Sequence, residues 1–151
     1  MTRCQGFDER GQVGGIEGLI FGVLIFVFGT LLVTNAWSVV DAKLAATAAA
    51  REAARTFVEG TAAADAERAA RGAAQDAIEG HGRRWERATL DLSRETFARC
   101  ARVTAAVDYE APLIVIPLLG QHGSGFTVSA KHSELVDPYR SGLGAEGACG
   151  P

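Results

Sequence analysis

The feature that most constrains this chain is an apolar run from Gly18 to Val40, GLIFGVLIFVFGTLLVTNAWSVV, which contains no charged residue. As an α-helix the run would be roughly 34 Å long, against a bilayer hydrocarbon core of about 30 Å. The alternative is a buried helix of a soluble protein, but the rest of a 151-residue chain would then have to cover the whole apolar cylinder. We therefore predict a single membrane span over residues 16–40.

The segment before the run, residues 1–15, is short, polar and punctuated by glycine. A secretory signal has a shorter apolar core of about 7–15 residues, followed by a cleavage site of small residues. Here the core is longer and helix-forming sequence follows, so we expect the span to be retained. Because Cys4 has no apolar stretch in front of it, we do not expect a lipoprotein anchor. The arginines before the run are matched by Lys43 and Arg51 after it, so the flanking charges do not settle orientation.

After the run the sequence becomes alanine-rich and contains no Gly or Pro before Gly60, which predicts that the helix continues over residues 42–59 as an amphipathic one. Small apolar side chains allow another backbone to approach closely. We expect this face to pack on a sheet through Ala46, Ala53 and Phe57. The apolar stripe at helical spacing consists of Val39, Ala42, Ala46, Ala49, Ala53 and Phe57.

A second helix is predicted over residues 62–79, with Thr61 as its N-cap and Gly80-His81-Gly82 as its stop. Because its apolar face is almost entirely alanine, burial per residue is small, and we expect a marginal, partly mobile layer. The expected face consists of Ala66, Ala70, Ala73 and Ala77.

Alternation of apolar and polar residues then predicts three strands, over 89–93, 101–109 and 126–136. Such alternation is typical of an antiparallel sheet with one packed face and one wet face. The fold class is therefore α+β, with a small domain over 41–136. The apolar block 113–119 between the last two strands is either buried under the sheet, which we favour, or exposed as a contact patch.

The Gly-rich tail, residues 137–151, is expected to be disordered. The net charge of −3 and the absence of a basic stripe argue against binding of nucleic acid. The only basic cluster, Arg83, Arg84 and Arg87, is interpreted as a solvated surface.

Residues with catalytic chemistry do not form a matched set. His122 and Ser124 are better explained by a turn, and neither a nucleophile elbow nor a third residue that would orient a base accompanies them. The three histidines, His81, His122 and His132, show no metal-type spacing. We therefore expect no enzyme activity, no cofactor and no metal site.

The three cysteines are Cys4, Cys100 and Cys149. They are neither a Cys-x-x-Cys pair nor at metal-ligand spacing. If the domain lies outside the cell, Cys100 and Cys149 can oxidise to each other, whereas Cys4 stays on the other side. Three free thiols are an equally compatible reading, since spacing alone does not show the distance between them.

A short polar leader, a glutamate at the head of a long apolar helix, an alanine-rich extension and a small sheet together resemble the type IV pilin-like proteins. In detail the chain is similar to the TadE-like family of tight-adherence (Flp) pilus assembly proteins, of the actinobacterial type. The segments that carry this resemblance are Arg10-Gly11-Gln12-Val13, Glu17 with the apolar run, Asp41-Ala42-Lys43-Leu44 and Ala50-Arg51-Glu52-Ala53-Ala54-Arg55. They lie within residues 10–59.

The resemblance implies a minor pilin or pilus assembly protein in the cytoplasmic membrane, with its C-terminal domain outside the cytoplasm. It also implies a prepilin peptidase that cuts after a glycine, here Gly11, and a glutamate, here Glu17, that pairs with the amino terminus of a neighbouring subunit. In the family this glutamate is the fifth residue of the mature chain. Cleavage after Gly11 would make Glu17 the sixth, and cleavage after Gly14 would make it the third.

Two functions from different classes follow. One is a subunit of a tight-adherence pilus or related secretion machine, with other apparatus subunits and membrane lipid as partners. The other is a single-pass anchor that presents a small extracytoplasmic domain to another cell-envelope complex. Glu17 separates them, because as a boundary charge it stays hydrated, whereas only polymerisation needs a carboxylate there.

Overall fold

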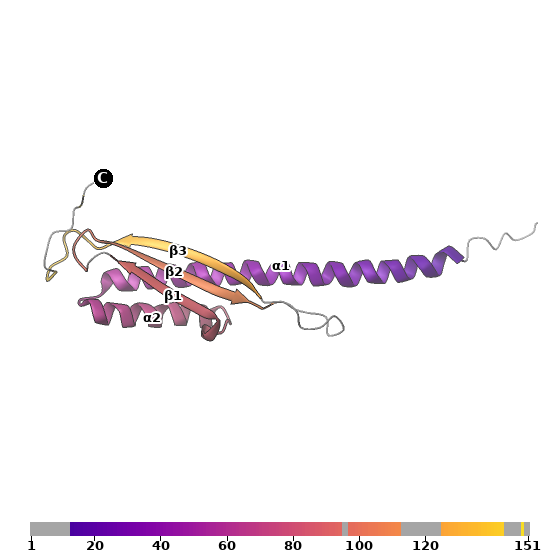
Figure 1. The fold of residues 1–151 in the computed structure, drawn as a ribbon, viewed down its shortest axis with the longest axis horizontal. Coiled ribbons are helices and arrows are strands. Elements are labelled where there is room, and N and C mark those ends of the chain that lie inside the picture. Colours follow the sequence, from indigo (N-terminus) through magenta and orange to yellow (C-terminus); the bar gives the residue numbers. More distant parts are fainter. Residues whose placement is uncertain (1–12, 95–96, 113–124, 144–148, 150–151) are drawn as a thin grey trace, which may run out of the picture. The chain divides into compact units, whose positions relative to one another are not determined.

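The computed structural model describes residues 13–94, 97–112, 125–143 and 149, and it confirms the α+β class. The elements in chain order are α1 (Val13–Glu59), α2 (Ala63–Gly80), the short 3-10 helix η2 (Trp85–Arg87), and the strands β1 (Ala88–Arg94), β2 (Arg102–Ala111) and β3 (Phe126–Leu135), as Figure 1 shows. The chain divides into two compact units, residues 1–36 and 37–151. Helix α1 contributes to both, and each unit is described by itself.

The three strands form one antiparallel sheet in the order β1-β2-β3. Their bounds agree with the predicted strands to within two residues at each end. Ala88 pairs with Tyr109 across β1 and β2, and Ala111 pairs with Phe126 across β2 and β3. Each strand therefore follows its neighbour in sequence as well as in space.

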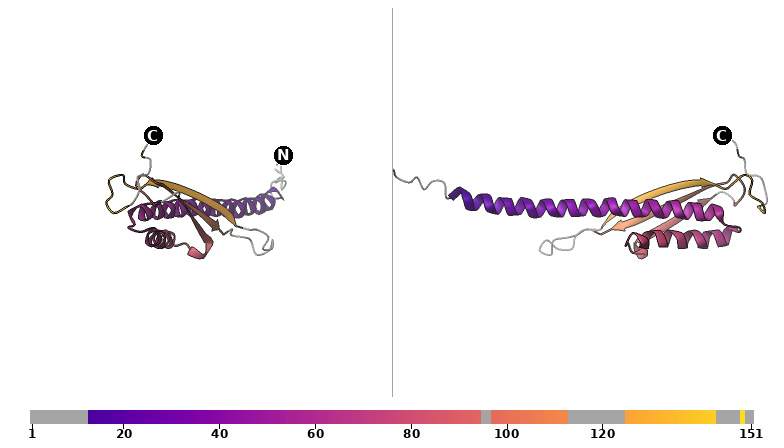
Figure 2. Two further views of the ribbon diagram at one scale, coloured as in Figure 1. Left: turned by 60° about the vertical axis from the view of Figure 1, so that its left-hand side comes forward. Right: turned by 180° about the vertical axis from the view of Figure 1, so that it is seen from behind.

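Unit 37–151 has two layers, the sheet on one side and the helices on the other, with α2 beside the part of α1 that begins at Trp37 (Figures 1 and 2). The predicted alternation of β2 is confirmed, because every second residue of this strand faces the helices and is buried. Its buried residues are Val103, Ala105, Val107, Tyr109 and Ala111.

The alanine stripe of α1 is confirmed as the centre of the core, since all of its members after Val39 have no exposed surface. The buried face is wider than the predicted stripe and also includes Ala45, Ala50 and Ala54. The physical reason is that α1 is covered by α2 as well as by the sheet (Figure 2). At the end of the helix, the ring of Phe57 meets the ring of Phe97 edge to face, with centroids 5.5 Å apart.

Helix α2 differs from its prediction in two respects. Ala73 and Ala77 are only half-buried, and the buried face follows a strict four-residue spacing that ends on Ile78. This rotation brings the one large apolar side chain of α2 into the core, which an all-alanine face would leave outside. The buried residues are Ala66, Ala70, Ala74 and Ile78.

The ends of α2 were predicted in part. Thr61 is not the N-cap: the helix begins one residue later, and the cap position is held by Ala62 in an extended conformation without a side-chain hydrogen bond. The predicted stop is confirmed, because Gly82 has a φ of 68° and its N–H donates to the carbonyl of Glu79 at 2.8 Å. Glycine adopts this left-handed conformation without the cost that a Cβ would add.

Two predictions on the sheet domain concern residues at its margins. The apolar block 113–119 lies outside the described residues. In the predicted tail the structure describes 137–143 and Cys149, and there Arg140 donates hydrogen bonds to the carbonyls of Val58 and Glu59. These two carbonyls belong to the last turn of α1, where the carbonyl groups have no hydrogen-bond donor within the helix. Arg140 thus caps the end of α1, and the expected disorder of the tail stays a prediction.

The packing of α1 predicts the effect of a charge at Ala53. This residue of the helix is fully buried against the rest of the core. Ala53→Glu should lower the free energy of unfolding by about 3–5 kcal/mol, because a carboxylate would be buried without a partner. Thermal unfolding of the full chain in detergent, followed by near-ultraviolet circular dichroism, measures the change. The control is Ala69→Glu on the exposed side of α2, which should unfold as the parent does. Equal transitions for both variants would contradict the packing described here.

Candidate functional site: the apolar segment of α1 and its flanking charges

The first unit contains the apolar part of α1, and its residues from Gly15 to Thr30 are all exposed. Within the described residues, α1 is the one helix that is long and apolar enough to cross a membrane. Side chains such as Phe26 and Leu32 are more than two thirds exposed, an arrangement that is costly in water. The segment is therefore suited to a nonpolar environment, as predicted for residues 16–40.

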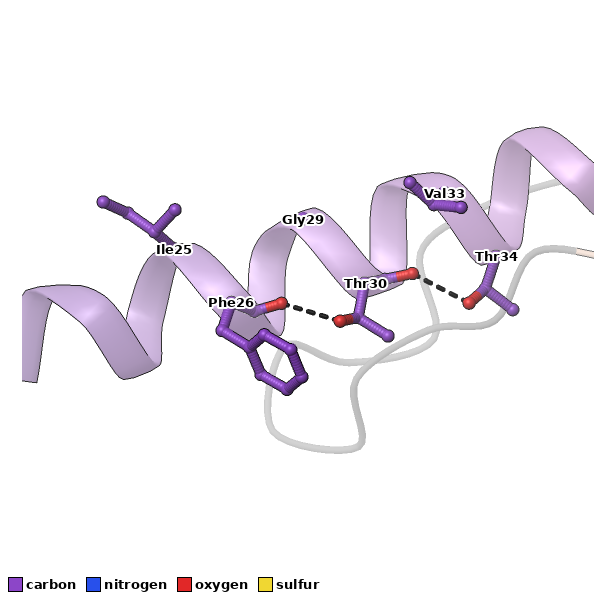
Figure 3. A pocket seen from close by; sticks show the side chains of 6 residues that line it. All are labelled: Ile25, Phe26, Gly29, Thr30, Val33 and Thr34. Atoms are coloured by element: carbon purple, nitrogen blue, oxygen red, sulfur yellow. Dashed lines mark hydrogen bonds between the residues drawn. The ribbon is translucent and has the colours of Figure 1, made fainter.

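The few polar side chains of this segment are satisfied by the helix itself. The hydroxyl of Thr30 donates to the carbonyl of Phe26 and that of Thr34 to the carbonyl of Thr30, both at 2.8 Å (Figure 3). The amide of Asn35 donates to the carbonyl of Leu31 at 2.9 Å. Because lipid offers no hydrogen bonds, such bonds back to the preceding turn lower the cost of placing polar groups there.

A shallow hollow lies on the surface of this helix over Gly29 (Figure 3). Its lining residues are Ile25, Phe26, Gly29, Thr30, Val33 and Thr34. Since a Cβ built on Gly29 would meet nothing within 4 Å, the glycine makes the hollow but no packing in the structure requires it. All of its described lining residues belong to α1.

Glu17 lies on the described part of α1, in its second turn, and is exposed. It is thus a carboxylate at the head of an exposed apolar helix, as the sequence predicted. The cleavage position Gly11 lies outside the described residues, so both its role and the assembly role of Glu17 stay predictions.

At the other end of the apolar run, Asp41 meets a partner that the sequence reading missed. Arg83, between α2 and η2, donates to one carboxylate oxygen of Asp41 from Nη2 at 2.6 Å and from Nε at 3.0 Å. It also donates to the carbonyl of Ser38 at 3.1 Å, and its guanidinium lies 5.9 Å from the ring centre of Tyr109. The side chain of Arg83 is only 14% exposed, so its assignment to a solvated basic surface was wrong.

The interpretation was right for the neighbour of Arg83. Arg84 is 75% exposed and pairs locally with Glu86. No sequence signal separated the two arginines, since Asp41 and Arg83 are 42 positions apart. The resulting contact ties the beginning of the domain's first helix to the end of its second helix and to β2.

Cys100 and Cys149 are joined as a disulfide in the structure, with Cα atoms 5.1 Å apart. Cys100 precedes β2 and has a φ of 60°, a conformation that is uncommon for a residue with a side chain. Cys4 lies outside the described residues. Whether the pair is oxidised in the cell stays a prediction, and it would place the domain in an oxidising compartment.

Among the described residues, no three His, Cys, Asp or Glu side chains lie together so that they could hold a metal ion. His81 is exposed in the stop of α2, whereas His132 on β3 lies 3.2 Å from Glu134. His122 lies outside the described residues. The expectation that the chain is not an enzyme stays a prediction.

Comparisons with protein-family models, with curated proteins and with solved structures found no match.

The contact of Arg83 predicts a specific loss of stability. Arg83→Gln should lower the free energy of unfolding by about 2 kcal/mol, because Asp41 would be left half-buried without its cation. The control Arg84→Gln should change it by less than about 0.5 kcal/mol, since an exposed pair contributes little. Denaturant unfolding of the full chain in detergent measures both. A smaller effect at Arg83 than at Arg84 would show that the contact has no structural weight.

The cysteine pair predicts a labelling pattern. In native membranes denatured without reductant, a maleimide should label Cys4 alone, because Cys100 and Cys149 are oxidised to each other. Cys100→Ser should add one label, at Cys149. Labelling of all three cysteines in the parent protein would mean that the domain is reduced.

Proposed function

We propose that this chain is a single-pass membrane protein of a tight-adherence, type IV-like pilus or related secretion machine, in which it acts as an assembly protein or minor pilin-like subunit. The observation that carries the proposal is that the two parts of α1 have different surroundings. Residues 18–36 form a largely exposed apolar helix without a charge, and the last part of α1 is the central helix of a small α+β domain. The sequence resemblance over residues 10–59 supplies the pilus context.

In this proposal the apolar segment is held in the cytoplasmic membrane, and the domain lies outside the cytoplasm. The disulfide of Cys100 and Cys149 supports that side, because disulfides persist in oxidising compartments. A prepilin peptidase that cuts after Gly11 would leave Glu17 close to a new amino terminus. The other subunits of the apparatus are then the partners that the exposed helix meets.

Glu17 is the assembly residue of the proposal. A subunit that leaves lipid for a bundle of helices brings its carboxylate away from water, and a charge in such a place needs a partner of opposite sign. The amino terminus of a neighbouring subunit would provide it. Glu17 is exposed and therefore accessible to such a partner.

The second candidate is a simple anchor that presents the domain to another complex of the cell envelope. The exposure of Glu17 also fits this function, because a carboxylate at the headgroup level stays hydrated and costs little. The two candidates differ in what happens when the carboxylate is removed.

Removal of this charge is the test. Glu17→Gln should insert in membranes at the level of the parent and resist carbonate extraction, yet no longer co-purify with the pilus apparatus or support it. The control is Glu52→Gln, which removes an exposed carboxylate from the domain part of the same helix and should assemble normally.

The outcomes separate the two functions. If Glu17→Gln assembles as the parent does, the carboxylate is only a boundary charge and the anchor is the better function. Release of the parent protein by carbonate would overturn both. Sequencing of the mature amino terminus from native membranes decides whether the peptidase acts, and at which glycine.

A further inference from the structure

Strand β3 runs beside the domain part of α1 and in the same direction (Figures 1 and 2). One contact gives their alignment. Near the start of this part, the ammonium group of Lys43 donates to the carbonyl of Ser129.

This contact sets the level of the first residue of β3 on the helix. Phe126 lies about 10 Å before Ser129, which corresponds to six or seven residues of helix before Lys43. Phe126 is therefore level with Trp37 along the helix axis.

Phe126 stands at a core position without core burial. It pairs with Ala111, so both side chains lie on the face of the sheet that covers the helices. Ala111 is buried, whereas Phe126 is 55% exposed. The apolar layer between sheet and helices thus reaches the end of the domain, where none of the residues that the structure describes covers the ring of Phe126 fully.

Trp37 is the residue at which this unit begins, and it is 72% exposed, as is much of Val40 one turn later. This end of the domain therefore exposes two aromatic rings near one level, and Arg83 compensates the charge of Asp41 there, directly after a run that is long enough to cross a membrane.

We infer that this end of the domain, with Phe126 and Trp37 as its exposed rings, is seated in the headgroup region of the lipid bilayer. The inference rests on the membrane anchoring in the proposed function. The covering partner is lipid because Trp37 follows the apolar run in the chain and therefore lies at the membrane boundary, where aromatic side chains are favoured. Phe126 shares its level through the alignment of β3 with α1. The domain thus touches the bilayer at a second point, on its sheet.

The test uses single tryptophans in a Trp37→Phe, Trp85→Phe background of the full chain. The protein is reconstituted in vesicles of phosphatidylethanolamine and phosphatidylglycerol, with and without brominated acyl chains, which quench a tryptophan that touches them. Phe126→Trp measures whether this end of the sheet touches the lipid. Tyr139→Trp is the matched control, because Tyr139 is 91% exposed and precedes Arg140, which binds the far end of α1. Phe26→Trp, within the apolar run, reports insertion alone.

The expected result is a loss of fluorescence for Phe126→Trp comparable to that of Trp37 in a Trp85→Phe variant, and no loss for Tyr139→Trp. The loss should not depend on the ratio of protein to lipid. Quenching at position 26 without quenching at position 126 would show that Phe126 does not touch the bilayer, although the helix is inserted. Quenching at neither position would overturn the membrane anchoring itself. If the tryptophan at position 126 escapes quenching only at a high ratio of protein to lipid, a second copy of the chain is the covering partner. This result would also overturn the inference.

Discussion

The domain depends on the close approach of the sheet and α2 to the alanine face of α1. Ala42, Ala46, Ala49 and Ala53 have no exposed surface, although a methyl group is the smallest side chain that can be buried. Each contributes little transfer free energy on its own, so the stability of the layer comes from many small contacts at short distance. Such a surface tolerates no enlargement, because neighbouring atoms fill the space around it.

This constraint explains where larger side chains and charges are found. Phe57, Ile78 and Tyr109 are fully or almost fully buried, and they belong to three different elements. Arg83 and Arg140 then bind groups of α1 that packing alone leaves open, namely the Asp41 carboxylate and the last carbonyls of the helix. The small core is thus completed by two long cationic side chains from later parts of the chain.

Much of this fold could be predicted from the sequence because its elements carry strong periodic signals. The charge-free run, the stripe that ends on Phe57 and the alternation from Val103 to Tyr109 each favour one interpretation. The face of α2 was harder, because stripes through Ala73 or Ala74 have the same composition, and only the burial of Ile78 decides between them. The contact of Arg83 with Asp41 could not be found, since no pattern links two charges so far apart in sequence. For the candidate site, Glu17 and the apolar run were identified from sequence, whereas the level of Phe126 requires the alignment of β3 with α1.

The chain order of the elements also determines when each part of the core becomes available during synthesis. The alanine face of α1 is complete at Glu59, but the last strand that covers it ends at Leu135, 76 positions later. At about 5–20 residues per second, the ribosome needs about 4–15 s to supply that strand. Until β3 is made, the sheet that covers the face is incomplete. A face of methyl groups attracts other apolar surfaces only weakly. The small side chains that permit close packing in the finished domain therefore also limit aggregation of the incomplete chain during synthesis.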